Sequence, residues 1–529
     1  MLHLIPGNPR NPPGKKPASS TRFVLPFAYR LGPLADHAAV DLDAPVFAEL
    51  ANADNPNLKR RKQYLTKETA KVLFERAHWF VLNKLPDGLA KLALVLQDGR
   101  SVEAALNPPL VILFECPNQP CSDHDVLRTG FLVLELYFPG DATPRFDDLL
   151  DINELFRYWR EPFHGHRQER TGASPGSGYQ RLLQNWPLSS GGKIKDASAK
   201  DEIYTRRWTG LLAHLLKPHT GPCLKLLVDD ISDCPVHADD RTYVWTCALI
   251  EGGGEALRDA FKPGADLDAT DYGHWIKLLN VDPPGGSPEN THYARRFEQE
   301  WAKPLTYRRW EECGTFYGFT PHSGAMLSAD VAEPPLWQHF GQMYFDQILL
   351  LLYVRTALFR FSERLADISA KARDTQEKTK GEAWLDDFDK LREDFVWFTN
   401  LYQFPLLSNQ QQAVEMYGLA RQAMDINELF AEVEKEIHGS HEYLSLQNQR
   451  RQTEMSTLLT VVATMGAVAA LAGTYLGLSW LKADGWIATT GVFAASVVYI
   501  LLFVWLAKPV SSGLEKLYKA GRWSKPNRQ

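Results

Sequence analysis

The chain has 529 residues, a formal net charge of −6, and 44% hydrophobic and 23% charged residues. This length exceeds one compact core, so we expect two or three structural units. The mild charge argues against a nucleic-acid partner. The six cysteines lack the spacing of a zinc site, which favours ordinary thiols in a reducing compartment.

Residues 1–21 are rich in proline, glycine and lysine and contain no apolar run. Such a segment cannot bury enough apolar surface to fold alone, and it is not a signal peptide. We therefore expect a disordered N-terminus over residues 1–21.

Residues 22–335 alternate strand-like and helical segments, which predicts a cytoplasmic α/β domain of undetermined strand order. The segments expected to form strands are Lys91–Leu96, Leu110–Glu115, Phe131–Phe138, Lys225–Val228 and Tyr243–Ile250. The segments expected to form helices are Lys67–Leu82, Phe146–Trp159 and Asn290–Trp301.

This region contains weak candidates for a binding site. His164 and His166 could hold a metal but lack an evident third ligand. Asp229, Asp230 and Asp233 could bind a hard divalent cation or simply form a solvated turn.

Two further features point to an anion without identifying a site. The loop over residues 163–200 is basic, so it could take an anion or a nucleotide, although a solvated insertion is the simpler interpretation. Gly191–Lys193 resembles the end of a phosphate loop but lacks its first glycine and its Ser/Thr. With no nucleophile elbow, paired catalytic carboxylates or dinucleotide fingerprint, we do not expect an enzyme.

Residues 336–454 read as stalk helices. Leu336–Lys380 and Glu382–Thr399 have helical patterns, and Ile348–Phe359 is too short for a membrane span and favours a buried helix. From Ser408 no proline interrupts the pattern until Pro509.

A heptad rhythm supports one very long helix in this part of the chain. Its apolar positions are Ile426, Phe430, Val433, Ile437 and Leu444. A helix from Ser408 to Leu478 would have about 70 residues and a length on the order of 100 Å. The alternative is a helix broken near Gly439.

The strongest signal is a pair of charge-free runs, which predicts a two-helix transmembrane hairpin over residues 455–507. The first run has 27 residues, Met455–Leu481, and the second has 23, Gly485–Ala507. About 20 apolar residues cross the ~30 Å hydrocarbon core of a bilayer. The connecting loop, Lys482–Asp484, is too short for a domain on the far side.

The positive charges beside the runs set the predicted orientation. Arg450 and Arg451 precede the first run, and residues 508–529 form a basic tail. By the positive-inside rule, both termini are cytoplasmic, in the inner (cytoplasmic) membrane. Two helices cannot enclose a pore, so conduction would require a homo-oligomer.

The first run is rich in small residues. Pairs four residues apart are Gly466/Ala470, Ala469/Gly473 and Gly473/Gly477. Small residues let helices approach closely in lipid, whereas the bulkier second run suits contact with lipid.

The order of parts resembles the CorA family of divalent-cation channels. The local similarity is closest in Met455–Tyr475, which ends in the Ala-Gly-x-Tyr stretch Ala472–Tyr475. The resemblance implies a homopentamer in a lipid bilayer that conducts magnesium. It also implies positions for the pore residues: a gate at Met455 and Leu458, a lining of Gly466, Ala469 and Gly473, and an outer mouth at Tyr475, Leu476, Gly477 and Leu478.

The chain departs from the family at its hallmark. The family has Tyr-Gly-Met-Asn, whereas this chain has Tyr475-Leu476-Gly477-Leu478. Mg²⁺ loses its water reluctantly, so a selective mouth must hydrogen-bond the hydration shell, which leucine cannot do. An alternative register turns Thr457, Thr460 and Thr464 towards the lumen and leaves the small residues to pack helices.

Three functions follow as hypotheses. The first is a CorA-like channel for metal cations, gated by its cytoplasmic domain, with a divalent cation such as Mg²⁺ as the one cofactor candidate. The second is an unselective pore that acts as a membrane effector in bacterial defence. A small molecule, such as a nucleotide messenger, would open it. The third is a membrane-anchored sensor or scaffold that conducts nothing.

Overall fold

The computed structural model describes residues 3–8, 10, 17–29, 47–49, 56–82, 91–95, 101–114, 128–157, 241–252, 270–284, 295–329, 336–378, 383–403 and 406–480. The chain divides into two compact units, Met1–Glu434 and Lys435–Gln529.

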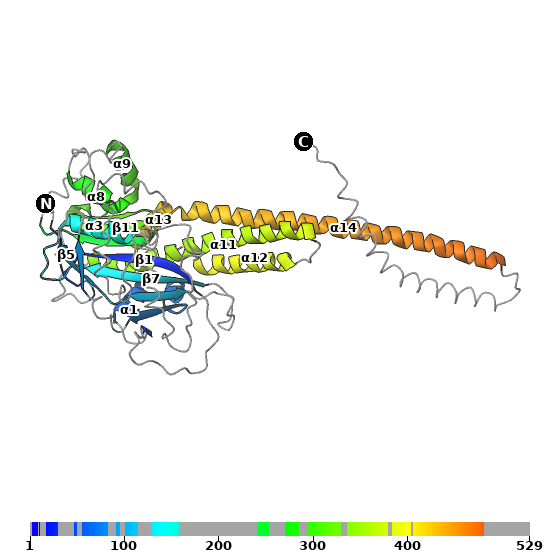
Figure 1. Cartoon of the computed structure of the whole chain (residues 1–529), viewed down its shortest axis with the longest axis horizontal. Helices are drawn as coiled ribbons and strands as arrows, with labels where there is room; N and C mark the ends of the chain where they lie inside the picture. The colour runs from blue at the N-terminus through cyan, green and yellow to red at the C-terminus, as the bar shows by residue number, and fades with distance from the viewer. Residues whose placement is uncertain are drawn as a thin grey trace, which may run out of the picture. The chain divides into compact units, whose positions relative to one another are not determined.

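The first unit is built on a mixed sheet with the strand order β2-β3-β6-β7-β1-β8-β11-β10-β9, and β4 and β5 extend from β7 (Figure 1). The pairs are antiparallel except β8 with β11. The strands are β1 Ser20–Tyr29, β2 Phe47–Glu49, β3 Ala77–Leu82, β4 Lys91–Val95, β5 Ser101–Leu106, β6 Leu110–Phe114, β7 Arg128–Tyr137, β8 Tyr243–Leu249, β9 Thr306–Tyr307, β10 Thr315–Phe319 and β11 Ser323–Ser328.

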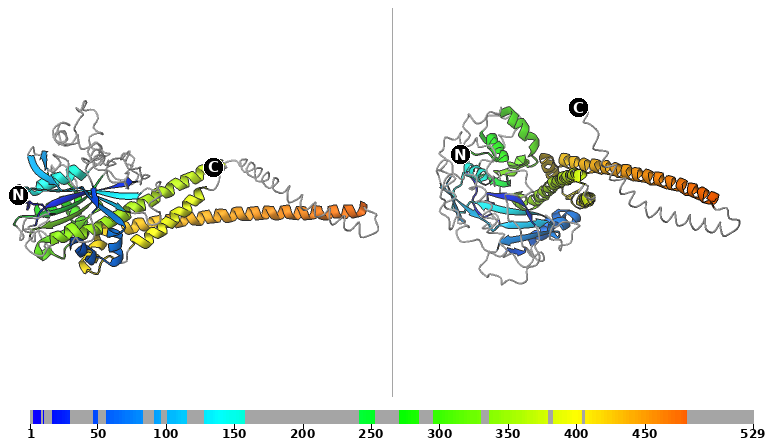
Figure 2. Two further views of the ribbon diagram at one scale, coloured as in Figure 1. Left: turned by 90° about the horizontal axis from the view of Figure 1, so that it is seen from below. Right: turned by 45° about the vertical axis from the view of Figure 1, so that its right-hand side comes forward.

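One face of the sheet packs on α3 (Phe146–Arg157) and α8 (Thr270–Asn280), with α9 (Arg295–Ala302) beyond them (Figure 2). Alternate residues of the central strands point to this face. Phe23 of β1 stacks near Phe156 of α3, with ring centroids 5.2 Å apart. Trp275 of α8 is fully buried in the same core.

The other face carries the first turns of α11 (Phe345–Lys378). The strand residues that alternate with those facing α3 and α8 point to this face. Among them, Trp245 of β8 stacks on Phe340, with ring centroids 3.9 Å apart. The short helices α1 (Pro56–Tyr64) and α2 (Lys67–Phe74) flank this side next to β3.

A short helix and a π-helical turn lead into α11. Helix α10 spans Leu336–His339, and the π turn spans Phe340–Tyr344. Residues Ile348 to Leu358 include side chains with 0% exposure, such as Leu350 and Val354. The prediction of a buried helix at Ile348–Phe359 is therefore confirmed.

The base of the stalk is a bundle of α11, α12 (Ala383–Tyr402) and the first turns of α14, and α11 and α12 lie side by side in Figure 1. Aromatic side chains hold it together. Phe361 and Phe395 meet edge to face at 5.2 Å, and Phe395 stacks on Phe430 of α14 at 5.6 Å. The apolar positions Ile426 and Val433 are buried, so in this unit the heptad rhythm serves packing within one chain.

The predicted continuous helix from Ser408 is wrong. Helix α13 spans Gln411–Ala423, and α14 begins at Ile426 and runs to Trp480 for 55 residues. The break comes at Asp425, which has a φ of 53°. The alternative break was also wrong, because Gly439 lies inside α14.

The described part of the second unit is the stretch of α14 from Lys435 to Trp480. Of the helices that can be described, none is long and apolar enough to cross a membrane. The second charge-free run and the basic tail lie outside the described residues. The transmembrane hairpin at 455–507 therefore stays a prediction, whereas the α/β region and the long helices are confirmed.

Other segments differ from their predictions. Residues 1–21 are not wholly disordered: His3 and Leu4 pair with Arg145 and Ile250, and Leu4 is buried. The helix predicted over Lys67–Leu82 ends at Phe74, because the β-rich stretch from Ala77 pairs with β6. Lys225–Val228 lies outside the described residues.

Candidate functional site

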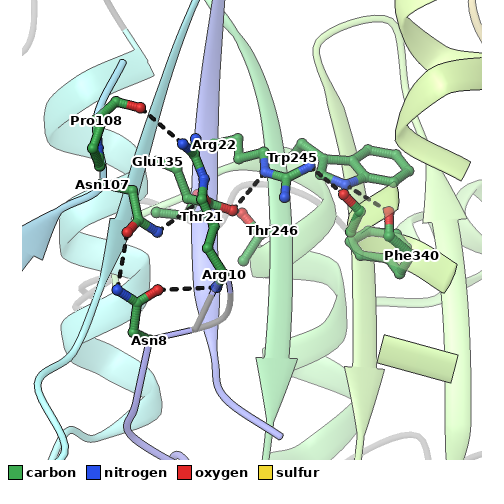
Figure 3. Close-up of polar contacts among 11 residues, drawn as sticks. Asn8, Arg10, Thr21, Arg22, Asn107, Pro108, Glu135, Trp245, Thr246 and Phe340 are labelled. Atoms are coloured by element: carbon green, nitrogen blue, oxygen red, sulfur yellow. Dashed lines mark hydrogen bonds and ion pairs between the residues drawn. The ribbon is translucent and has the colours of Figure 1, made fainter. Parts of the chain in front are cut away.

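A carboxylate is fully buried in the middle of the sheet. Glu135 of β7 is the register partner of Arg22 of β1, so both side chains point to the α11 face. Arg22 Nε donates to Glu135 Oε1 at 2.7 Å, and Arg10 Nε donates to Oε2 at 2.5 Å (Figure 3). Asn107 Nδ2 adds a bond to Oε2 at 2.9 Å. We call these four residues the Glu135 cluster.

The segment around Arg10 closes the Glu135 cluster from the N-terminal side. Arg10 Nη1 donates to the carbonyl of Pro108 at 2.9 Å, and its backbone N–H donates to Asn8 Oδ1 at 2.9 Å. Asn8 Nδ2 in turn donates to Asn107 Oδ1 at 3.0 Å (Figure 3). The N-terminal residues therefore complete a buried site formed mainly by β1 and β7.

Charge pairing decides the ionisation state of Glu135. Burial alone would raise its pKa, but the guanidinium groups of Arg22 and Arg10 outweigh that effect and lower the pKa to about 2. Glu135 is thus an anion at any physiological pH. Two cations around one buried anion make the cluster strongly interdependent.

Arg22 also grips the π turn at the start of α11. Its Nη1 donates to the carbonyl of Gly341 at 2.5 Å, and its guanidinium lies 4.6 Å from the ring centre of Phe345. Trp245 Nε1 donates to the neighbouring carbonyl of Phe340 at 3.2 Å (Figure 3). Turns of π type recur at functional sites, where helix carbonyls become available to side chains.

The position of the Trp245 indole requires a glycine on the neighbouring strand. Gly324 of β11 is its register partner, and a Cβ there would lie 2.3 Å from the Trp245 ring. Any larger residue would push the ring off the π turn.

A second ion pair holds the same end of α11. Asp346 is fully buried, and Arg61 of α1 makes two hydrogen bonds to its carboxylate. Burial raises the pKa of Asp346 despite the pull of Arg61 and Arg22 in the opposite direction. Arg61 also lies 5.0 Å from the ring centres of Phe74 and Trp79. Charged groups from β1 and α1 thus converge on the first residues of the stalk.

The hydrogen bonds of this arrangement hold parts of the fold in position. Every residue of the Glu135 cluster is hydrogen-bonded to another part of the fold, and the π turn accepts one bond from Arg22 of this cluster and one from Trp245. Within the described ranges, no group of three His, Cys, Asp or Glu side chains could hold a metal ion. Burial raises the pKa of the Cys247 thiol to about 12, so this thiol is unreactive.

The predicted gate and pore residues all lie on α14. Met455 is 50% exposed and Leu458 is partly exposed. Gly466 is buried, Gly473 is exposed, and a Cβ at Gly473 would meet nothing within 4 Å. Ala469 and the outer-mouth residues Tyr475, Leu476, Gly477 and Leu478 are also part of this helix.

The alternative stripe of threonines is bonded to its own helix. Thr457, Thr460 and Thr464 each donate their hydroxyl to the carbonyl four residues earlier, at 2.7, 2.7 and 2.9 Å. Such bonds satisfy a hydroxyl without a partner helix or water.

Sequence reasoning missed the Glu135 cluster, although a signal was present. Glu135 is the one charged residue in the predicted strand Phe131–Phe138, and an acid in a buried strand demands a partner. The other sequence candidates lie outside the described residues: His164, His166, Gly191–Lys193, Asp229, Asp230 and Asp233. Comparison with protein-family models, curated proteins and solved structures found no match to this chain.

Proposed function

We propose that this chain forms a homo-oligomeric, CorA-like membrane channel for metal cations, gated by its cytoplasmic α/β domain. Residues 455–507 are its two-pass hairpin in the inner membrane, with both termini in the cytoplasm, and five copies surround the pore by resemblance to the family. Met455 and Leu458 form the gate, and Gly466, Ala469 and Gly473 line the lumen above it.

The observation that carries the proposal is the character of α14. The helix continues without a break from Ile426 into the charge-free run. There it exposes large apolar side chains, with Leu459 60% and Met465 68% exposed. An isolated helix that is apolar on several faces needs lipid or other helices around it.

The bonds at the start of α11 support gating by the α/β domain. A ligand that shifts β1 or α1 would move Arg22 or Arg61, and both grip the first residues of the stalk. A ring of Met455 and Leu458 would then open by dewetting, because a small widening admits water to an apolar constriction.

Purified protein in liposomes tests the channel directly. We expect metal-cation flux, little discrimination for Mg²⁺, and loss of flux when Gly473→Trp fills the lumen. Absence of flux for every cation tested would rule out the channel. Reaction of Gly466→Cys, Ala469→Cys and Gly473→Cys with aqueous thiol reagents separates a pore from the anchored sensor, in which none would react.

Leu478 favours a second function, an unselective pore that acts as a defence effector. With leucine at position 478, where the family has asparagine, that position offers no side-chain hydrogen bond to a hydrated ion. A small-molecule signal on the cytoplasmic domain would open such a pore and depolarise the cell. Expression separates the two functions: a channel for magnesium rescues a magnesium-starved strain, whereas an effector arrests growth when its signal is present.

A further inference from the structure

Four tyrosines from different elements gather where α1, the strands β9 and β10, and the π turn meet. They are Tyr64, Tyr307, Tyr317 and Tyr344. The ring centre of Tyr344 lies 6.2 Å from that of Tyr64 and 5.8 Å from that of Tyr317, both edge to face. The register partners Tyr307 and Tyr317 have ring centres 6.2 Å apart. We call these four residues the tyrosine cluster.

The hydroxyl groups of the tyrosine cluster influence one another. Burial raises the pKa of Tyr344, and the hydroxyls of Tyr64 and Tyr317 raise it further. The pKa of Tyr317 is likewise raised by burial first and then, among other groups, by Tyr307 and Tyr64. Interactions between like groups weaken with distance. Together with the ring contacts, these effects place the hydroxyls in one polar group.

Helix α13 satisfies part of this group. Gln412 Nε2 donates to the Tyr344 hydroxyl oxygen at 2.9 Å. The Tyr307 hydroxyl donates to Glu415 at 2.5 Å, and Arg309 pairs with the same carboxylate at 2.9 Å. The negative charge of Glu415 is therefore already compensated by its own partners.

Two hydroxyls of the tyrosine cluster find no acceptor among the described residues. Tyr317 is 0% exposed, and its hydroxyl has no hydrogen-bond partner there. Burial raises the pKa of Tyr64, while Gln412 and Tyr344, which approach its oxygen as donors, lower it. The O–H of Tyr64 itself meets no acceptor in the described ranges. Native structures satisfy nearly all buried polar groups, with protein atoms or with a bound molecule.

His339, at the end of α10, adds a third donor. Its ring centre lies 6.4 Å from that of Tyr64 and 6.2 Å from that of Tyr344. Arg60 Nη2 is 2.9 Å from His339 Nε2, and a guanidinium can only donate, so Nε2 accepts. Burial and then the charge of Arg60 lower the pKa of His339 to about 4, so the ring is neutral and carries its hydrogen on Nδ1. That buried N–H also has no partner within the described part of the chain.

We propose that the tyrosine cluster and His339 bind one small monovalent anion of the size of chloride, which accepts hydrogen bonds from Tyr64, Tyr317 and His339. All three groups are donors that lack an acceptor, which is the chemistry an anion requires. The ion carries a single charge because Arg60 is the one cation bonded to these donors within the described residues. Phosphate groups are typically held by charge-assisted bonds from arginine or lysine.

The anion would join α1, α10 and β10 at the residues that lead into α11. The site does not depend on the proposed channel, because each of its donors belongs to the first unit, Met1–Glu434.

Thermal unfolding of the full chain in detergent, followed by tryptophan fluorescence, tests the site. The protein is compared in sodium chloride and in sodium gluconate at one ionic strength, since gluconate is too large to replace chloride. Chloride should raise the Tm of the wild type by on the order of 2 °C and then saturate, because a ligand that binds only the folded state stabilises it. An equal Tm in both salts would overturn the proposal and leave water as the partner of these donors.

Two variants separate binding from general effects of salt, which act alike on both. Tyr317→Phe removes one donor with little change of shape, so it should abolish the rise with chloride. In gluconate it should melt no lower than the wild type, because it removes a buried hydroxyl without a partner. The matched control is Tyr243→Phe. Tyr243 of β8 is buried, and its hydroxyl also lacks a partner among the described residues, but it lies outside the tyrosine cluster. This variant should keep the full rise.

The remaining outcomes also decide the question. Loss of the chloride effect in both variants, or in neither, would overturn the site, as would a phosphate effect that Tyr317→Phe abolishes while chloride has none. If Tyr317→Phe fails to fold, Tyr64→Phe replaces it under the same criterion. If the wild type conducts no cation in liposomes, the channel fails, while the melting temperatures still decide whether the anion binds.

Discussion

The two units differ in the side chains that are unfavourable without a partner: the first buries charged groups, and the second exposes large apolar groups. In the described part of Met1–Glu434, the buried carboxylates of Glu135 and Asp346 are paired with arginines: Glu135 with Arg10 and Arg22, and Asp346 with Arg61. In the described part of Lys435–Gln529, one helix leaves apolar side chains such as Leu459 and Met465 exposed. The described helix of the second unit thus presents large apolar side chains to its surroundings, and the proposed channel would place them in lipid or against other copies of the chain.

The largest effect should come from removing the buried anion. Glu135→Gln leaves two guanidinium groups around a neutral amide, and breaking a buried ion pair costs about 3–5 kcal/mol. Urea unfolding of the detergent-solubilised chain, followed by tryptophan fluorescence, measures this loss. The control is Asp387→Asn, whose carboxylate is 46% exposed and pairs with the exposed Lys371 at 3.5 Å, and it should cost about 1 kcal/mol or less. Equal losses for both variants would remove the distinction between the buried cluster and an ordinary surface pair.

Acid should weaken the first unit through the same residue. The pKa of Glu135 falls from its ordinary value of 4.5 to about 2 on folding, so its contribution is present above about pH 4.5 and is lost as the pH falls towards 2. The difference corresponds to about 3 kcal/mol. Unfolding free energies of wild type and Glu135→Gln should therefore converge between pH 4.5 and pH 2. Parallel pH profiles would show that Glu135 is not the group responsible.

A charge on α14 should expose the dependence of the second unit on its surroundings. Met465→Arg places a cation inside the charge-free run, where insertion scales assign a cost of about 2.5–3.5 kcal/mol near a helix centre. We expect the variant to leave the membrane fraction when cells are extracted with alkaline carbonate. Leu446→Arg, at an exposed apolar position upstream of the run, should stay in the membrane. Extraction of the wild-type chain itself by alkaline carbonate would argue against the hairpin.

The sequence predicted the regular elements of the first unit where their periodicity was strong. Strands β4, β6, β7 and β8 and helix α3 lie where alternation or a 3.6-residue pattern placed them. Strands β1 and β3 were missed, because β1 carries Arg22 and Pro26 and β3 follows α2 with no proline or glycine to mark the change. The end of α13 was missed because a backbone turn at one aspartate leaves no break in the apolar pattern.

The candidate site was harder to predict, since it joins residues far apart in the chain. Arg10, Arg22, Glu135 and Gly341 come from the N-terminal segment, two strands and the π turn. Only strand register brings Arg22 opposite Glu135, and pairing of this kind is set by the whole sheet. Local patterns can mark a charge in a strand as needing a partner, but they cannot name that partner.

The smallest effect should come from the threonine stripe, and it bears on which face of α14 lines a pore. Thr460→Val is nearly isosteric and removes a hydroxyl that already bonds the Ser456 carbonyl at 2.7 Å. We expect a change in stability of about 0.5 kcal/mol or less, since the carbonyl keeps its helical bond.

The single-channel conductance of the Thr460→Val variant tests which face of α14 lines the pore. If Gly466 and Gly473 line the lumen, Thr460 lies on the other side of the helix and the single-channel conductance of the variant should match that of wild type. If the threonines face the lumen, valine replaces a hydroxyl that solvates the passing ion, and conductance should fall while Gly473→Ala has no effect. An unchanged Thr460→Val together with a sensitive Gly473→Ala would therefore assign the lumen to the small residues, and the reverse pair of results would assign it to the threonines.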